Sequence, residues 1–407
     1  MKKIIYFIVC CLCLIGCQKK IVCNQSELKI IVASDLHYFL KDYYQDCEWF
    51  EESMLYGDGK MVTYGDEIID AFIKAIQQEQ PDLVVLTGDL SFNGEKGSHQ
   101  ALAAKLEQLT DDTVVAVIPG NHDVDNIYAK GYGKDDYFDV ENVNAKAFQD
   151  IYQNCGYQIA SFQHENSLSY RIDLNNDYSL LMMDSNAHEQ TKMTLGSGGF
   201  FTDSTMQWLK EQLEDIQKDK KTPLVAMHHN LAIHNDILNS GYTIDNHEEI
   251  AQLFAKYNVP FVLSGHIHCQ NIKSIDGIYD IASSSLLDAP LQYGVIDLDA
   301  NSMNYHTQSL KISKDANVYF DTVSAHKFAE DLQKVSDSSK REAIQDVMVK
   351  ANRYYFTGCM NQYQKELQEH PGYQYLQSED LSFYQDYLET MLQETTSSQE
   401  LSITFKK

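Results

Sequence analysis

Short apolar runs alternate with polar and amphipathic stretches between residues 28 and 298. Each run is apolar throughout, which is typical of a strand that is buried on both faces of a sheet. Between the runs, Glu67–Gln78 and Thr205–Ile216 place their apolar residues on one helical stripe. This alternation of strands and helices predicts an α/β domain. The predicted strands are Ile30–Ala33, Leu83–Leu86, Val114–Ile118, Leu180–Met183, Leu224–Met227 and Pro260–Leu263.

The pattern changes to helical spacing after about residue 319. The segments Ser324–Val335, Lys340–Phe356 and Ser378–Gln393 each repeat apolar residues every three or four positions. We therefore expect a small helical C-terminal domain over residues 319–395. A tail is expected over residues 396–407.

The N-terminus has the parts of a bacterial lipoprotein signal. A basic start is followed by an apolar run of 12 residues (4–15), too short to span a bilayer as a mature helix. The run ends in Leu14-Ile15-Gly16-Cys17, which resembles a lipobox, where the chain is cut before a cysteine that becomes diacylated. We expect a signal peptide over 1–16, a tether over 17–27, and an extracytoplasmic protein anchored in the cell membrane by lipidated Cys17. An ordinary secretory signal is the alternative.

Charge narrows the expected partners. The chain carries 59 acidic and 32 basic side chains, which gives a formal net charge of −27. Because a protein that binds a nucleic-acid backbone needs a cationic face, we expect no nucleic-acid polymer as a partner. The sequence leaves the oligomeric state open.

Residues with metal-binding side chains directly follow five of the apolar runs. Because the carboxyl ends of parallel strands form the ligand crevice of an α/β sheet, we expect these side chains to converge. Asp, Asn and His supply the oxygen and nitrogen ligands of divalent metal ions. The five segments are Ser34-Asp35-Leu36-His37, Thr87-Gly88-Asp89, Pro119-Gly120-Asn121-His122-Asp123, His228-His229 and Ser264-Gly265-His266-Ile267-His268.

Two of these segments carry their ligand-type residues two positions apart. Residues i and i+2 of an extended chain point to the same side. Asp35 and His37 are therefore expected to address one ion, and so are His266 and His268, unless each pair serves two ions side by side. The spacing predicts a site for one or two metal ions.

The five segments resemble, in order, the sequence blocks of the calcineurin-like metallophosphoesterases: D-x-H, G-D, G-N-H-D/E, H and G-H-x-H. The resemblance covers about residues 28–300. The stretch Gly88–Gly94 is similar to the form found in bacterial cyclic-nucleotide phosphodiesterases, and the lipoprotein signal resembles that of Gram-positive cell-surface members. The resemblance implies a four-layer α/β/β/α sandwich over residues 28–318, followed by the helical domain.

The resemblance also implies a centre of two divalent metal ions with seven ligands. The Asp89 carboxylate bridges the ions, and a hydroxide between them attacks phosphorus. His122 is not a ligand in this scheme, but stabilises the developing charge and protonates the leaving oxygen. Asp123 is a candidate to orient His122. The implied ligands are Asp35, His37, Asp89 and His268 for the first ion, and Asp89, Asn121, His228 and His266 for the second.

Position 92 bears on the identity of the metal. In the purple acid phosphatase branch of the family, a tyrosine three residues after the bridging Asp ligates Fe(III), whereas this chain has Phe92. A stable ferric site is therefore not expected. Mixed imidazole, carboxylate and amide ligands suit divalent Mn, Fe or Zn, and we expect manganese first.

Neighbouring residues have less specific roles. We expect His228 rather than His229 to be the ligand, because His228 directly follows the strand and matches the family's block. His188, Asn230 and His234 are candidates either for substrate contact or for ordinary packing.

The stretch Tyr38–Tyr64 is rich in aromatic residues. It is either a loop packed over the edge of the domain or a cover that stacks a base over the metal cleft. The helical C-terminal domain likewise either closes the cleft or braces the structure.

Together these features predict a dinuclear metal-dependent phosphodiesterase. The resemblance favours a small phosphodiester of the 3′,5′-cAMP type as substrate. Two alternatives stay open: an extracellular phosphomonoesterase or nucleotidase, and a non-catalytic surface lipoprotein that binds a solute or partner. The net negative charge does not oppose phosphate binding, because two divalent ions outweigh the carboxylates of Asp35 and Asp89 locally.

Overall fold

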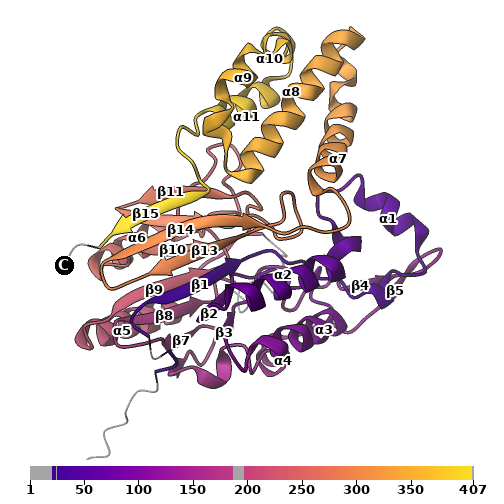
Figure 1. The fold of residues 1–407 in the computed structure, drawn as a ribbon. Coiled ribbons are helices and arrows are strands. Elements are labelled where there is room, and N and C mark those ends of the chain that lie inside the picture. Colours follow the sequence, from indigo (N-terminus) through magenta and orange to yellow (C-terminus); the bar gives the residue numbers. More distant parts are fainter. Residues whose placement is uncertain (1–20, 24, 187–196, 406–407) are drawn as a thin grey trace, which may run out of the picture.

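Two mixed β-sheets pack face to face at the centre of the computed structural model, which describes residues 21–23, 25–186 and 197–405 (Figure 1). In pairing order, the six-stranded sheet contains β15 (Glu400–Thr404), β14 (Ser302–Ser309), β13 (Gln292–Leu298), β1 (Leu28–Ala33), β2 (Leu83–Leu86) and β3 (Val114–Val117). The seven-stranded sheet contains β11 (Asn271–Ile275), β12 (Ile278–Ala282), β10 (Phe261–Ser264), β9 (Thr222–Met227), β8 (Tyr178–Met183), β7 (Tyr170–Asp173) and β6 (Phe162–Gln163).

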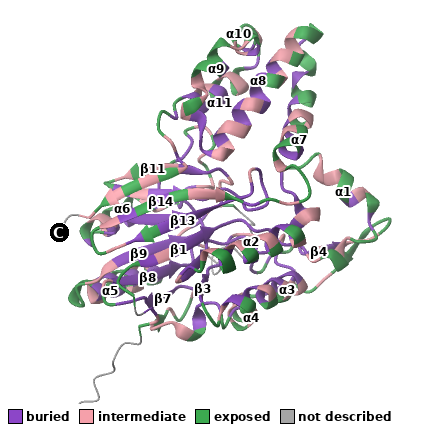
Figure 2. Ribbon diagram, in the orientation of Figure 1, coloured by how far each residue is buried: buried purple, intermediate pink, exposed green. Residues whose placement is uncertain are grey.

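Alternate residues of the central strands belong to different layers, as expected of strands buried on both faces. In β8, Leu180 and Met182 lie in the core between the two sheets, whereas Leu181 and Met183 pack in a separate outer core. Figure 2 shows the central strands as buried and the outer surfaces of the helices as exposed.

Helices cover the outer face of each sheet. On the six-stranded sheet, Phe72 contacts Tyr293 of β13 with a ring distance of 5.6 Å. On the seven-stranded sheet, Leu209 and Phe254 share the outer core with β8. This arrangement confirms the expected four-layer α/β/β/α sandwich. The covering helices are α2 (Gly65–Glu79), α3 (Lys96–Leu106) and α4 (Ala145–Ile151) on one side, and α5 (Asp203–Lys218) and α6 (His247–Lys256) on the other.

The expected helical C-terminal region is also present. It has a hydrophobic core of its own, in which Phe328, Ile344, Met348 and Leu388 are buried. Its helices are α7 (Ala316–Asp331), α8 (Ser338–Thr357), α9 (Gln364–Glu369), α10 (Pro371–Leu376) and α11 (Ser382–Leu392).

The expectation of a tail over residues 396–407 is wrong for its described part. The chain returns from the helices to the six-stranded sheet, where β15 pairs antiparallel with β14. Leu401 and Ile403 alternate along β15 and pack against the main core, a period-two pattern that a stretch this short signals weakly. The helical domain is therefore inserted between β14 and β15, and the sheet holds the chain on both sides of it.

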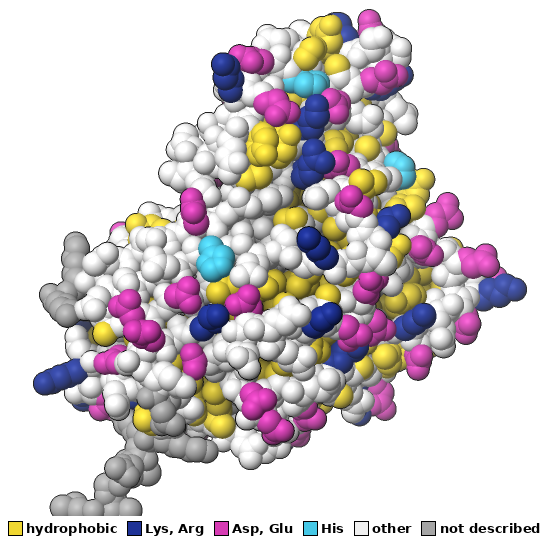
Figure 3. Space-filling view, in the orientation of Figure 1, with side chains coloured by type: hydrophobic (Ala, Val, Ile, Leu, Met, Phe, Trp, Pro, Cys, Tyr) yellow, Lys and Arg dark blue, Asp and Glu magenta, His cyan; other side chains and the backbone are white. Residues whose placement is uncertain are grey.

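The expected signal peptide and Cys17 lie outside the described residues. The described part of the expected tether packs on the sandwich, where the amide of Cys23 donates to the carbonyl of Leu174 at 2.7 Å. Within the described residues, none of the helices combines the length and the hydropathy that crossing a bilayer requires. On the face drawn in Figure 3, acidic and basic side chains of the described residues are interspersed, without the continuous basic stripe typical of nucleic-acid binding.

Candidate metal centre

The five predicted segments meet at one edge of the two sheets. They follow β1, β2 and β3 of one sheet and β9 and β10 of the other, and backbone hydrogen bonds join them. The amide of Asp35 donates to the carbonyl of Gly88 at 3.0 Å, and the amide of Gly265 donates to the carbonyl of His228 at 3.0 Å. The expected convergence at the carboxyl ends of the strands is thus present in the structure.

The ligand-type residues are not in extended chain, as their i, i+2 spacing had suggested. Asp and His tolerate the left-handed region better than most residues, and such strained positions gather at functional sites. The two closely spaced pairs therefore converge through left-handed turns rather than through strand alternation. The residues with positive φ are Asp35 (53°), His37 (36°), Asp89 (48°), His266 (72°) and His268 (56°).

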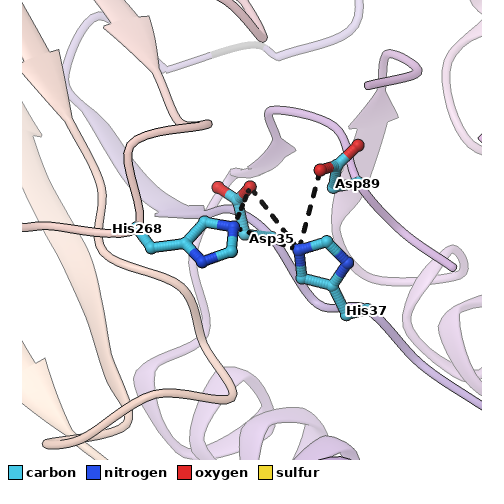
Figure 4. A group of neighbouring side chains, drawn as sticks. All are labelled: Asp35, His37, Asp89 and His268. Atoms are coloured by element: carbon cyan, nitrogen blue, oxygen red, sulfur yellow. Dashed lines mark hydrogen bonds and ion pairs between the residues drawn. The ribbon is translucent and has the colours of Figure 1, made fainter. Parts of the chain in front are cut away.

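The first group contains four side chains whose ligand atoms all lie within 4.8 Å of one another: Asp35, His37, Asp89 and His268. The Nε2 atoms of His37 and His268 are 3.1 Å apart. Asp35 Oδ1 lies 3.3 Å from His268 Nε2, and Asp89 Oδ2 lies 3.6 Å from His37 Nε2 (Figure 4). Four donor atoms therefore face one small volume.

The second group contains Asp89, His228 and His266. Asn121 joins it, because Asn121 Oδ1 lies 3.0 Å from His228 Nε2. His228 Nε2 is also 3.5 Å from Asp89 Oδ1. All seven predicted ligands are thus brought together, in the two sets that the family resemblance implied.

Asp89 belongs to both groups, and its two oxygens face different ones. Oδ2 is directed to His37, whereas Oδ1 is directed to His228. Oδ1 also accepts a hydrogen bond from the amide of His122 at 2.9 Å. A carboxylate placed in this way can hold one cation at each oxygen, which is the arrangement of a dinuclear site.

Outer hydrogen bonds set which ring nitrogen each histidine presents. His228 Nδ1 lies 2.9 Å from the carbonyl of Thr87, so this nitrogen carries the proton and Nε2 is left as the ligand atom. His266 Nε2 lies 2.8 Å from the carbonyl of Gly241, which leaves Nδ1 as its ligand atom. The two rings therefore offer lone pairs before any ion binds.

Gly88 has no side chain, which allows its backbone to lie close to the ring of His228. Its φ is +99°, and an added Cβ atom would lie 2.6 Å from His228 Nδ1. A side chain here would clash with a ligand, and most residues avoid this conformation.

The donor set fits divalent metal ions. Asp35 Oδ1 is buried and has no hydrogen-bond partner in the described part of the chain. A buried polar atom without a partner costs free energy, which a bound cation would offset. Burial opposes ionisation of Asp35, but the nearby His268 lowers the pKa of this carboxyl below its usual range. Burial is the largest cause, and the nearby His228 the next, of a pKa of His266 lowered to about 4. His266 is therefore neutral and able to ligate.

His122 lies at the rim and is not part of either group. Its Nε2 atom is 4.0 Å from Asp89 Oδ2, and 31% of its side chain is exposed. Its Nδ1 atom lies 2.8 Å from the carbonyl of Phe92 and 3.0 Å from Asn93 Oδ1. These acceptors hold a proton on Nδ1 and leave Nε2 facing the site.

The expectation that Asp123 orients His122 is wrong. The Asp123 carboxylate instead accepts hydrogen bonds from the amides of Gly120 at 2.8 Å, Ser91 at 2.9 Å and Leu90 at 3.0 Å. It therefore joins the second and third motif loops to each other. The groups that orient His122 come from the residues after Asp89.

The neighbouring candidates are engaged in structural contacts. His229 Nδ1 lies 2.7 Å from Ser185 Oγ and its Nε2 lies 2.8 Å from the carbonyl of Ser197, so both ring nitrogens are engaged. His234 is held by Asn271 at 2.8 Å and Asp280 at 3.1 Å. Asn230 Nδ2 donates to Ser264 Oγ at 2.9 Å. His188 lies outside the described residues.

The aromatic stretch after the first segment packs at the edge of the domain. It contains α1 (Glu48–Met54) and packs against the hairpin of β4 (Lys130–Tyr132) and β5 (Tyr137–Asp139). The rings of Phe50 and Tyr132 are 4.5 Å apart, and those of Phe39 and Phe92 are 5.0 Å apart. These four rings pack against one another.

The same stretch supplies a residue that sequence reasoning missed. Lys60 is buried, with Nζ 3.4 Å from His37 Nε2 and 3.0 Å from Asp58 Oδ2. Burial would lower the pKa of Lys60, but Asp58 and Asp288 raise it above its usual value, so the side chain is cationic. Nothing in the local sequence marks Lys60, because a single lysine in a loop is ordinarily solvated.

Asp288 was also missed. It is buried, and its Oδ2 lies 3.4 Å from His268 Nδ1, on the opposite side of the ring from the ligand atom. Burial would lower the pKa of His268, but Asp35 and Asp288 raise it to about 10. A cation that binds at His268 must therefore displace a proton.

Comparison with known proteins agrees with this geometry. Residues 28–270 match the family described as calcineurin-like phosphoesterase. This chain belongs to that family. The phosphoesterase also matches, over residues 299–398, the family described as the C-terminal domain of cyclic nucleotide phosphodiesterase. Its clustered His and Asp side chains form a site of the kind that binds two divalent metal ions.

Two curated relatives cover part of this phosphoesterase. A probable cyclic nucleotide phosphodiesterase from Coxiella burnetii is 26% identical over 190 residues, which are 46% of this chain and 61% of that protein. A probable glycerophosphodiester phosphodiesterase from Arcobacter nitrofigilis is 26% identical over 193 residues, 46% of this chain and 57% of that protein. The chain thus spans less than two thirds of the length of these relatives.

A solved structure shares the fold. The dimetal phosphatase from Danio rerio aligns with a TM-score of 0.50 and 12% identity, over 69% of this chain and 96% of that one. At this identity the likeness supports the fold alone.

Proposed function

We propose that this phosphoesterase hydrolyses a cyclic nucleotide of the 3′,5′-cAMP type. The observation that carries the proposal is the presence, in one chain, of two metal-ligand groups that share Asp89 and a C-terminal region that matches the C-terminal domain of cyclic nucleotide phosphodiesterase. The Coxiella burnetii relative is named for cyclic nucleotides and the Arcobacter nitrofigilis relative for glycerophosphodiesters. A phosphodiester is the chemistry that both names share.

The residues around the centre support a role in diester cleavage. Two divalent ions, when bound, polarise a phosphoryl oxygen and lower the pKa of water. In its doubly protonated form His122 delivers the Nε2 proton to the leaving oxygen and keeps the Nδ1 proton, which Phe92 and Asn93 accept and thereby hold the ring in place. The partial exposure of His122 leaves this nitrogen accessible to a substrate.

We propose manganese as the native metal. The donors are imidazole nitrogens, carboxylate oxygens and one amide oxygen, without a thiolate, and this mixture suits divalent Mn, Fe or Zn. Phe92 stands where a phenolate ligand for Fe(III) would be needed.

One assay tests the function. Metal is removed from the purified protein with a chelator, and Mn, Fe(II) or Zn is restored before hydrolysis is measured. The substrates are cAMP, bis(p-nitrophenyl) phosphate and p-nitrophenyl phosphate. We expect hydrolysis of both diesters, fastest with manganese, and much slower release from the monoester. Metal-dependent turnover of the monoester alone would contradict the proposal, and no turnover with any metal would support a binding protein.

Lys60 supports a second candidate, a phosphomonoesterase or nucleotidase. A monoester dianion carries one more negative charge than a diester, and a buried cation beside the metal ligands would help to hold it. Asp58 and Asp288 already balance much of that charge, which is why the diester is preferred here. The ratio of diester to monoester turnover separates the two candidates.

We also propose that the protein acts outside the cytoplasm, anchored in the membrane through lipidated Cys17. The support is the lipobox-like sequence Leu14-Ile15-Gly16-Cys17. In the producing bacterium, Cys17→Ser should move the protein from the membrane fraction to the soluble fraction or leave its signal uncut. Membrane retention of that variant with its signal cleaved would contradict the anchor.

A further inference from the structure

A cavity of about 380 Å³ lies between the two domains, and we call it the interdomain pocket. The catalytic domain contributes His266, His268 and Tyr242 to its wall. The helical domain contributes Phe356 from α8 and Phe383 from α11. A volume of this size is typical of sites that hold a small organic molecule.

The interdomain pocket opens directly onto the metal centre. His266 and His268 line it and are also predicted ligands, one in each group of the centre. The two domains are in firm contact here, because an added Cβ atom at Gly59 would lie 3.0 Å from the Phe320 ring of α7 and 3.1 Å from Asp288 Oδ1. A substrate whose phosphate lies at the centre therefore has a cavity beside it for the rest of the molecule.

Eight phenylalanine and tyrosine side chains line the interdomain pocket. The rings of Tyr242 and His266 are 5.2 Å apart, and the rings of Phe320 and Phe356 are 5.0 Å apart. Phe383 lies nearly parallel to Tyr387, with an angle of 12° between the rings. Rings of this kind bind a flat aromatic ligand by stacking and apolar contact.

Phe383 is also 52% exposed. It lies on α11, which also carries residues of the buried core of the helical domain, but Phe383 itself is not part of that core. A bound flat ring would remove this apolar surface from water.

A hydrogen-bonded pair of polar side chains in the interdomain pocket can orient a bound ligand. The Tyr387 hydroxyl donates to Asn352 Oδ1 at 3.1 Å, and both residues line the cavity. This bond leaves the Nδ2 hydrogens of Asn352 available to an acceptor such as a ring nitrogen. A few placed polar groups in an apolar wall are the usual basis of specificity in such sites.

We propose that the interdomain pocket binds the nucleobase of the substrate and that the helical domain thereby selects a nucleotide over a glycerol-based diester. This assignment rests on the proposed function for its class of ligand. A glycerol group is small and polar and would leave the aromatic walls unfilled. The helical domain is then part of the substrate site rather than a brace.

Direct binding of a nucleoside tests the pocket without depending on catalysis. Binding of adenosine and of guanosine to the manganese-loaded full chain is measured by calorimetry, for the wild type, Phe383→Ala and Tyr375→Ala. Tyr375 is a matched control, because it is an exposed aromatic residue of the helical domain outside the interdomain pocket. Circular dichroism checks that both variants fold.

We expect at least one nucleoside to bind, with affinity lowered about tenfold in Phe383→Ala and unchanged in Tyr375→Ala, because one base-to-ring stack accounts for such a factor. The KM for cAMP should rise by the same factor in Phe383→Ala, with kcat unchanged. Failure of both nucleosides to bind, or equal binding to Phe383→Ala and wild type, would overturn the pocket assignment. Nucleoside binding through Phe383 without hydrolysis of cAMP would support the pocket and overturn the proposed function.

Discussion

His268 Nδ1 lies 3.4 Å from Asp288 Oδ2, while Nε2 of the same ring points to Asp35. A carboxylate behind a metal-binding imidazole fixes the orientation of the ring and strengthens it as a ligand. Asp288 follows no apolar run of the kind that marks the other segments, so its part in the centre became visible only through the fold.

Asp288→Asn should therefore weaken metal binding. We expect a loss of about 10- to 100-fold in affinity for the first ion, since outer partners of metal ligands have effects of this size. Competition with a metal-sensitive dye measures it. Asp297→Asn is the control, because Asp297 is exposed on β13. Unchanged affinity in Asp288→Asn would show that His268 needs no such support.

His122→Ala should leave the metal in place and slow the reaction. Because His122 is placed as a proton donor and not as a ligand, turnover of cAMP should fall by about 10²- to 10⁴-fold. A diester with a good leaving group, such as bis(p-nitrophenyl) phosphate, should be affected less. Metal content by mass spectrometry and the two rates are measured together, with His306→Ala as an exposed control on β14. Loss of metal from His122→Ala would make His122 a ligand instead.

The shared position of Asp89 predicts how metal content responds to single substitutions. Asp89→Ala removes an oxygen from each group and should lose both ions, whereas His228→Ala affects only the second group. We expect about two ions per chain in the wild type, about one in His228→Ala and nearly none in Asp89→Ala after dialysis against dilute manganese. Equal loss in the two variants would argue against a bridging role.

The sequence predicted the location of the centre because its ligands directly follow strands. Asp35, Asp89 and Asn121 come after strands of one sheet, and His228 and His266 after strands of the other. Strand ends are local features of a single segment. The order of the five segments then identified the family, and with it the division of the ligands into two sets.

Features that depend on contacts between distant segments could not be predicted from the sequence of any single segment. Lys60 and Asp288 reach the site from loops whose local sequence is unremarkable, and the strand β15 is short and follows a whole helical domain. The interdomain pocket likewise exists only because α7, α8 and α11 pack over the sheet edge. The left-handed backbone of Asp35 and His37 is fixed by hydrogen bonds to a neighbouring loop.

Glu95 provides a prediction on stability that is separate from the metal site. Its carboxylate is fully buried at the start of α3, where Oε2 accepts a hydrogen bond from the amide of Asn93 at 3.0 Å. Oε1 has no hydrogen-bond partner among the described residues. Burial raises the pKa of Glu95 from 4.5 to about 7.

This raised pKa makes the folded protein less stable as the pH rises. Between pH 4.5 and about 7 the folded state keeps a proton that the unfolded state has released, so the contribution of Glu95 to stability falls through this window. Glu95→Gln does not titrate and should gain stability relative to the wild type at pH 8 but not at pH 4.5, by ~3 kcal/mol at most. Urea unfolding at the two pH values measures it. The exposed Glu249 gives the control variant Glu249→Gln, and an equal difference at both pH values would mean that Glu95 ionises normally in the folded state.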